Sequence, residues 1–140
     1  MRTTALVSFL RAISAGVTSL MMSNATVPGL TTLPASMLPV AIGYLRHALG
    51  FHGLMMTDPP SAGVNSALHL RVPRASVDSL TTGADEVLNG DLASPAVAPT
   101  ASHAAAAPVV ALGDGRRTRA ELVLAAALVL AATNHLRCAV

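Results

Sequence analysis

Polar side chains that could do chemistry follow two short apolar segments of this sequence. Ser23 and Asn24 come directly after the run VTSLMM, and Asp58 comes directly after GLMMT. Asp58 is the only acidic residue among the first 77 positions. A carboxylate at the end of a buried strand can serve as a nucleophile or a base, and it can equally cap a turn before Pro59. The spacing alone leaves both interpretations of Asp58 open.

The elements that would position these residues alternate between helices and strands. From apolar periodicity and Gly, Pro and Ser boundaries, helices are predicted over 3–15, 36–49 and 73–82, and strands over 17–22, 53–58 and 84–88. Ser36 is expected to cap the second helix. This alternation indicates an α/β protein with parallel βαβ units. In such sheets the chemistry lies at the C-terminal ends of the strands, which is where Ser23, Asn24 and Asp58 fall.

Asp85 and Glu86 stand at the start of the third predicted strand. In parallel α/β sheets the catalytic residues lie at the C-terminal ends of the strands, and the N-terminal ends of the strands are associated with stability. We therefore expect these two carboxylates to have a structural role.

The last third of the chain changes in composition. Residues 91–115 are dominated by Ala, Pro, Ser and Gly and are predicted to form a linker or irregular segment. Residues 116–140 are predicted to hold a C-terminal helix that is apolar nearly all round, so we expect it to be buried. Its eleven consecutive apolar residues, Leu122–Ala132, fall short of the ~20 that span a bilayer, so no membrane span is predicted.

Composition excludes several function classes. Only 11% of the residues are charged and 2% are aromatic, with no Trp. Since few aromatic rings are present to stack on bases, we expect no nucleic-acid partner, and the cluster Arg116, Arg117 and Arg119 is expected to be a solvated face. The single cysteine, Cys138, excludes an intramolecular disulfide, and the five histidines lack metal-ligand spacing. We expect neither a metal site nor a cofactor.

The first 25 residues superficially resemble a signal peptide, with a basic residue, an apolar run and small residues. Arg11 interrupts the apolar run after Leu10, which leaves the run shorter than the hydrophobic region of such peptides. We therefore predict no signal peptide, and both a cytoplasmic and an exported location stay open.

The second predicted helix and strand carry a resemblance to a known family. The run LRHALGFHGLMMTD resembles glycoside hydrolase family 3, in the branch that contains the β-N-acetylhexosaminidases. There a helix ending in Leu-Arg-x-x-Leu-Gly-Phe-x-Gly-Leu leads into a strand ending in Thr/Ser-Asp. The upstream segment LPAS and the downstream segment TGADEVL match further elements of that branch in the same order. The agreement covers residues 5–90.

The resemblance implies part of a (β/α)₈ barrel over residues 1–90, about its last three βα units, followed by the C-terminal helix. A complete barrel needs roughly 250 residues, so the 140 residues cannot hold one. By resemblance, Asp58 is the nucleophile of a retaining glycosidase that acts on β-linked glycosides, those of N-acetylglucosamine included. Ser23 and Asn24 are then expected to bind substrate.

The catalytic partner that the resemblance requires is not found in this sequence. In that branch the acid/base is a His in a Lys-His-Phe-Pro-Gly-like loop, and no such motif occurs among the 140 residues. We therefore expect a truncated hydrolase that is inactive alone and that self-associates through unpaired barrel edges. The alternative is a non-enzymatic Ala/Pro-rich interaction or surface protein whose apolar helices pack on a partner.

Overall fold

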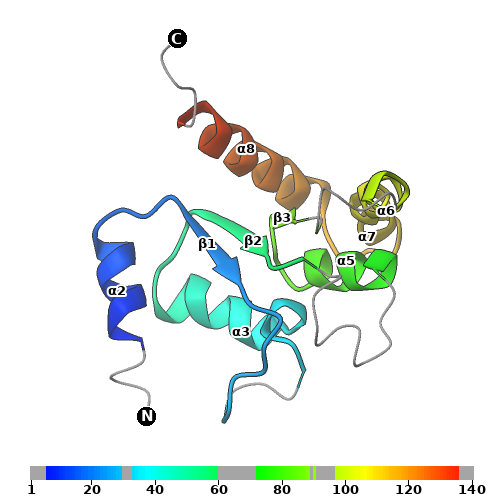
Figure 1. Cartoon of the computed structure of the whole chain (residues 1–140). Coiled ribbons are helices and arrows are strands. Elements are labelled where there is room, and N and C mark those ends of the chain that lie inside the picture. Colours follow the sequence, from blue (N-terminus) through cyan, green and yellow to red (C-terminus); the bar gives the residue numbers. More distant parts are fainter. Residues whose placement is uncertain (1–5, 30–32, 60–71, 89, 91–96, 136–140) are drawn as a thin grey trace.

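The computed structural model describes residues 6–29, 33–59, 72–88, 90 and 97–135 (Figure 1). In these residues a three-stranded sheet has the order β1 (Ser19–Met22), β2 (Leu54–Thr57) and β3 (Glu86–Val87). The helices are α2 (Val7–Ser14), α3 (Pro39–Gly43), α5 (Val72–Thr81), α6 (Val97–Ala105), α7 (Ala107–Gly113) and α8 (Arg119–His135). A 3₁₀ turn, η1 (Ala35–Met37), precedes α3, and a π-helical turn, η2 (Tyr44–Ala48), extends it.

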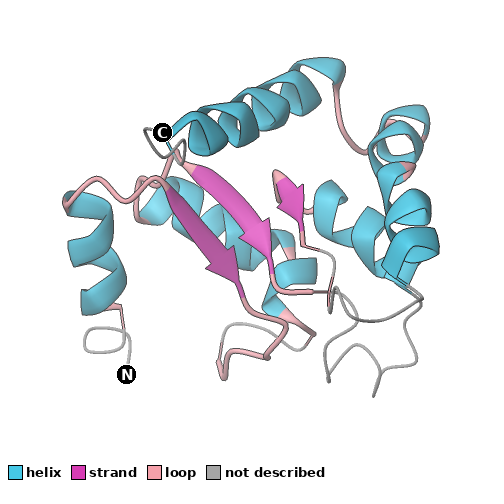
Figure 2. Cartoon of the chain, turned by 45° about the horizontal axis from the view of Figure 1, so that its top comes forward, coloured by secondary structure: helices cyan, strands magenta, loops and turns pink. Residues whose placement is uncertain are grey.

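Both strand pairs are parallel, which confirms the predicted α/β class. Met22 lies opposite Thr57, and Met56 lies opposite Glu86. Figure 2 shows the three arrows pointing the same way, with α3 and α5 as the connections between successive strands. The C-terminal ends of β1 and β2 therefore meet at one edge of the sheet.

The core lies between the sheet and the segment formed by α3 and η2. Its largest members are Met22 and Met55 from the strands, Ile42 and Leu45 from the helical segment, and Phe51 from the turn before β2. Ile42 and Leu45 belong to the apolar stripe predicted for the second helix. Because the α3–η2 segment and the strands contribute to one cluster, the core packs directly beneath β1 and β2.

The second helix begins later than the sequence predicts. Ser36 does not cap it: this residue lies one turn earlier, in η1, with its side chain buried. The helix begins at Pro39, which has no backbone N–H to leave unsatisfied and a fixed φ suited to a first turn. Gly50 closes the segment with φ 68°, as predicted.

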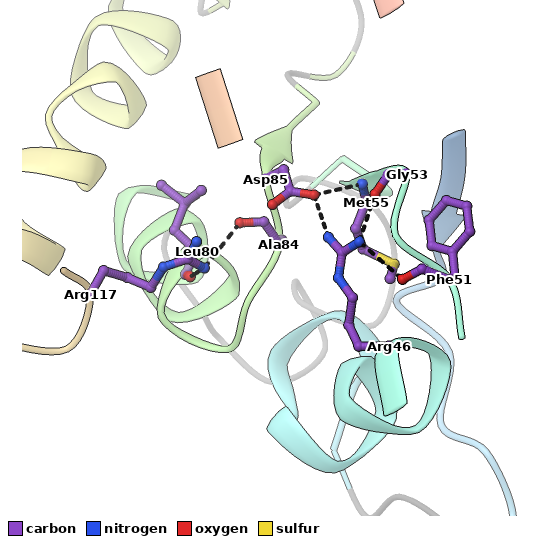
Figure 3. A network of polar contacts seen from close by, with 8 residues as sticks. All are labelled: Arg46, Phe51, Gly53, Met55, Leu80, Ala84, Asp85 and Arg117. Carbon is purple, nitrogen blue, oxygen red and sulfur yellow. Dashed lines mark hydrogen bonds and ion pairs between the residues drawn. The ribbon is translucent and has the colours of Figure 1, made fainter. Parts of the chain in front are cut away.

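An ion pair at the N-terminal ends of the strands joins three segments (Figure 3). The Arg46 guanidinium donates to Asp85 Oδ2 at 2.5 Å, and to the carbonyls of Gly53 and Phe51 at 2.6 and 3.3 Å. Asp85 Oδ2 also accepts the Met55 N–H at 2.9 Å, and its side chain is only 6% exposed. The structural role predicted for Asp85 is therefore confirmed.

Close backbone packing fixes the chain just before β2. A Cβ added to Gly53 would lie 2.4 Å from the Thr18 carbonyl oxygen and 2.7 Å from the Phe51 ring. Only glycine fits this approach. The same carbonyl of Thr18 accepts the Leu54 N–H at 2.9 Å, which starts the pairing of β1 with β2.

The structure of residues 97–113 differs from the one that the sequence predicts. The Ala- and Pro-rich composition suggested a linker or irregular segment, but these residues form helices α6 and α7, which pack against α5. Alanine is the strongest helix former, and Pro108 lies in the first turn of α7, where proline is tolerated. The division of the chain into residues 1–90, 91–115 and 116–140 stays a prediction.

Arg117 also differs from its prediction as part of a solvated face. Its side chain is 8% exposed and donates to the carbonyls of Leu80 and Ala84 at 2.9 and 3.5 Å. These carbonyls lie at and beyond the C-terminal end of α5, where a cation also complements the helix dipole (Figure 3). Arg117 thus attaches the start of the C-terminal region to the βα units.

Helix α8 is less buried than its apolar sequence predicts. Ala125 is buried, whereas Val123, Leu124 and Leu130 are each at least 60% exposed. Thr118 and Glu121 cap its N-terminus reciprocally, and the hydrogen bond from the Thr118 backbone N–H lowers the pKa of Glu121.

None of the helices in the described ranges is long and apolar enough to cross a membrane.

The Arg46 ion pair yields a stability prediction. Arg46→Ala leaves the buried Asp85 carboxylate without its cation, so we expect the free energy of unfolding to fall by about 3 kcal/mol. Arg74→Ala is the matched control, because Arg74 also pairs with an aspartate, Asp78, but at the surface with 67% exposure. It should leave stability nearly unchanged. Urea unfolding monitored by circular dichroism measures both, and equal losses would contradict the role given to Arg46.

Candidate active site

Asp58 lies at the C-terminal end of β2, at the sheet edge that the sequence predicts. Its backbone N–H donates to the Met22 carbonyl at 2.8 Å, so the pairing of β1 with β2 continues up to this residue. Asp58 is half-buried, and within the described part of the chain its carboxylate has no ion pair. A carboxylate whose backbone is fixed and that is not paired with a cation is suited to nucleophilic or base chemistry.

Asn24 is brought beside Asp58 but does not face solvent. It is 4% exposed, and its Nδ2 donates to the Pro59 carbonyl at 2.7 Å and to the Asp58 carbonyl at 3.5 Å. Its Oδ1 accepts the Ser36 hydroxyl at 2.6 Å. The amide is therefore occupied by protein groups on both sides, and it ties the loop after β1 to the backbone that carries the carboxylate.

Ser23 has the opposite character. It is exposed, and its hydroxyl oxygen accepts the Ala25 N–H at 3.0 Å. Its carbonyl accepts the Ser36 N–H at 3.2 Å, so the backbone is fixed while the side chain is exposed. Of the two residues predicted to bind substrate, Ser23 is the one whose side chain is accessible.

Ser36 completes this arrangement, and sequence reasoning missed it as part of the site. Besides its hydroxyl bond to Asn24, its carbonyl accepts the Thr82 hydroxyl at 3.2 Å, which connects the site to the end of α5. Its segment Pro-Ala-Ser was the available signal, but periodicity suggested a helix cap instead. A series of hydrogen bonds from Thr82 through Ser36 to Asn24 therefore supports the backbone of Asp58 and Pro59.

Thr57, directly before Asp58, faces inward. It is fully buried, and its hydroxyl makes no hydrogen bond with the described parts of the chain. Met55, two positions earlier, points to the same core side of the sheet. Alternation along a strand thus directs Thr57 toward the core and leaves Asp58 as the residue that emerges from it.

His47 and His52 lie away from this site. His47 and His52 are exposed and line a cavity of about 680 Å³ together with Arg46 and Asp85, at the N-terminal ends of the strands. In the ranges that the structure describes, no three His, Cys, Asp or Glu side chains gather in a way that could hold a metal ion. The loop after Pro59 lies outside the described residues.

Comparison with known families and structures gives a consistent result. Residues 1–122 match the family description "Glycosyl hydrolase family 3 N terminal domain". No protein with a curated description matches the chain. The sequence match includes the helix, strand and Asp58 on which the resemblance rests.

Solved structures share the fold. A glycoside hydrolase family 3 β-N-acetylglucosaminidase from Paenibacillus sp. str. FPU-7 is 24% identical, with a TM-score of 0.74 over 90% of this chain and 23% of its own. The β-N-acetylhexosaminidase of Beutenbergia cavernae is 25% identical, with a TM-score of 0.72 over 91% of this chain and 36% of its own. The Thermotoga maritima β-N-acetylglucosaminidase is 20% identical, with a TM-score of 0.70 over 86% and 26%. This chain therefore spans about a quarter to a third of these relatives.

The contrast between Asn24 and Ser23 generates a second prediction. Asn24→Ala leaves the Ser36 hydroxyl and the Pro59 carbonyl without their partner, so we expect the free energy of unfolding to fall by about 2 kcal/mol. Ser23→Ala, next to it, removes one exposed hydrogen bond and should cost less than about 1 kcal/mol. Thermal unfolding of the two variants compares them directly. If the Asn24→Ala chain were as stable as the parent, the result would contradict the structural role of Asn24 and favour its predicted role in binding substrate.

Proposed function

Because this chain belongs to glycoside hydrolase family 3, we propose that Asp58 is the nucleophile of a retaining glycosidase mechanism. The observation that carries the proposal is the position of Asp58, at the carboxyl end of β2 with its backbone bonded to Met22 and Asn24. A nucleophile needs a fixed direction of attack, and these bonds supply it.

The chemistry follows from the carboxylate. Asp58 attacks the anomeric carbon, the bond from that carbon to the leaving-group oxygen breaks, and a glycosyl ester forms on Asp58. Water then attacks the same carbon and returns the carboxylate. An acid/base group, ~5–5.5 Å away when it is a carboxyl, protonates the leaving group and later activates the water.

The substrates that we propose are β-linked glycosides of N-acetylglucosamine. The support is that the Paenibacillus and Thermotoga relatives are named β-N-acetylglucosaminidases and the Beutenbergia relative a β-N-acetylhexosaminidase. Ser23 is the accessible hydroxyl beside Asp58 and is the residue of this chain that we assign to substrate hydroxyls. Asn24 acts on the backbone of Asp58 instead.

We further propose that β1, β2 and β3 correspond to strands six to eight of a (β/α)₈ barrel. The parallel order and the small share of each relative that the chain spans support this assignment. The chain then holds the nucleophile of the site without the acid/base, so alone it does not turn substrate over. Unpaired sheet edges would make such a unit associate with itself.

A non-enzymatic interaction protein remains the second candidate, and one observation favours it. Val123, Leu124 and Leu130 on α8 are exposed, and no charged residue lies between Glu121 and His135. An uncharged helix face of this kind is typical of a surface that packs on another protein.

The role of Asp58 as nucleophile can be tested although this chain lacks the acid/base. A 2,4-dinitrophenyl N-acetyl-β-glucosaminide has a leaving group that needs no protonation, so the first step depends on the nucleophile alone. We expect the chain to gain the mass of one N-acetylhexosaminyl group on the peptide that contains Asp58, with one equivalent of dinitrophenolate released. Intact-mass and peptide mass spectrometry measure the adduct.

The matched control is Asp58→Asn, which keeps the size of the side chain and removes its nucleophilic charge. It should give no adduct. We expect no steady hydrolysis of 4-nitrophenyl N-acetyl-β-glucosaminide by the unaltered chain, and turnover that Asp58→Asn abolishes would show that the chain supplies its own acid/base. An unaltered chain that never forms the adduct would argue against Asp58 as nucleophile.

A further inference from the structure

Strand β1 has one open edge. Among the described residues it pairs with β2 only, and it forms the end of the sheet order β1–β2–β3 (Figure 2). The Thr18 and Met22 carbonyls accept N–H groups of the β2 segment, so the backbone groups of alternate residues point toward β2. The N–H and C=O groups of Ser19 and Met21 consequently point away from the sheet, toward the open edge.

This edge lacks the features that usually block strand addition. Residues 17–24 contain no charged residue and no proline. Natural edge strands are commonly protected by charges, prolines or bulges. The opposite edge of the sheet differs, because β3 has only two residues, one of them Glu86, and directly follows Asp85. Pairing is therefore favoured at β1 and disfavoured at β3.

An apolar groove runs beside the open edge. A cavity of about 300 Å³ lies between α2 and the α3 segment, lined by Phe9, Leu20, Met21, Val27 and Tyr44 among others. Phe9 and Met21 are 42% and 55% exposed. An added strand would satisfy the backbone groups of β1 while its side chains cover this groove.

We propose that the occupant of this edge is a second copy of the chain, paired antiparallel with β1 across a two-fold axis at Leu20. In that register Ser19 of each copy lies opposite Met21 of the other, and all four outward-pointing residues form hydrogen-bonded pairs. A register shifted toward Ser23 is less favourable because the Ser23 carbonyl already accepts the Ser36 N–H. The edge is thus complementary to itself.

The assembly closes at two copies. A two-fold contact uses the same edge of both chains, and the charged, short edge of β3 does not extend it. This inference rests on the proposed self-association and assigns it an edge, a register and a size.

Sedimentation velocity over a wide concentration range tests the size. We expect two chains per particle at high concentration. Ser19→Pro removes an outward N–H and leaves the pairing with β2 intact, since proline is tolerated on a strand edge and at a strand start. Met21→Lys places a charge on the same edge. Both variants should sediment as single chains, whereas Val123→Lys, a charge at a 61% exposed apolar residue on α8, should still form dimers.

Cross-linking tests the register. In a Cys138→Ser background, Leu20→Cys should form a disulfide between copies, because directly opposed residues of a non-hydrogen-bonded pair have Cα atoms ~4.5 Å apart. Val123→Cys, which is more exposed, should not. Circular dichroism confirms that each variant folds, and Met21→Lys decides the question if Ser19→Pro does not fold.

Three results would overturn this inference: a single chain at every concentration, a dimer that Met21→Lys leaves intact, or a dimer that Val123→Lys dissociates instead. The Asp58 adduct, measured on the same samples, keeps the two proposals apart. A single chain that forms the adduct rejects the dimer and supports the nucleophile, and a dimer without the adduct does the reverse.

Discussion

The ion pair between Arg46 and Asp85 is the interaction on which the rest of the described structure depends. It joins the end of the α3–η2 segment to the starts of β2 and β3, since Asp85 also binds the Met55 N–H and Arg46 binds the Gly53 carbonyl. A buried ion pair gives little net stability, but it is costly to break. Its contribution here is therefore to fix where two parallel strands begin, and so where β2 ends and Asp58 emerges.

The local pattern of the chain predicted much of this arrangement. Short apolar runs alternating with periodic segments gave the parallel sheet, and polar residues after each run placed Ser23, Asn24 and Asp58 at one edge. These predictions succeed because strand and helix periods depend on nearest neighbours. The LRHALGFHGL run predicted the family, and the structure gives a physical reason for two of its residues, Arg46 and Gly53, which hold the start of β2.

Other features depend on contacts between distant segments, which periodicity does not contain. Asn24 is predicted to bind substrate, and the pattern gives no sign that Pro59 and Ser36 hydrogen-bond its amide from 35 and 12 positions away. Arg117 was predicted to be solvated, but its guanidinium donates to carbonyls at and beyond the C-terminal end of α5. The helices over 97–113 were missed for a different reason: small residues typical of linkers are also strong helix formers, and packing on α5 decides between the two.

The absence of a side chain at Gly53 has a genetic consequence. Every single-base change that converts a glycine codon to that of another amino acid adds a Cβ, and at this position the Cβ meets the Thr18 carbonyl and the Phe51 ring. Backbone cannot yield as a flexible side chain does, so β2 would have to shift against β1. A point mutation five codons before Asp58 would therefore damage the site without altering any residue in it, and this codon belongs among the least mutable of the gene.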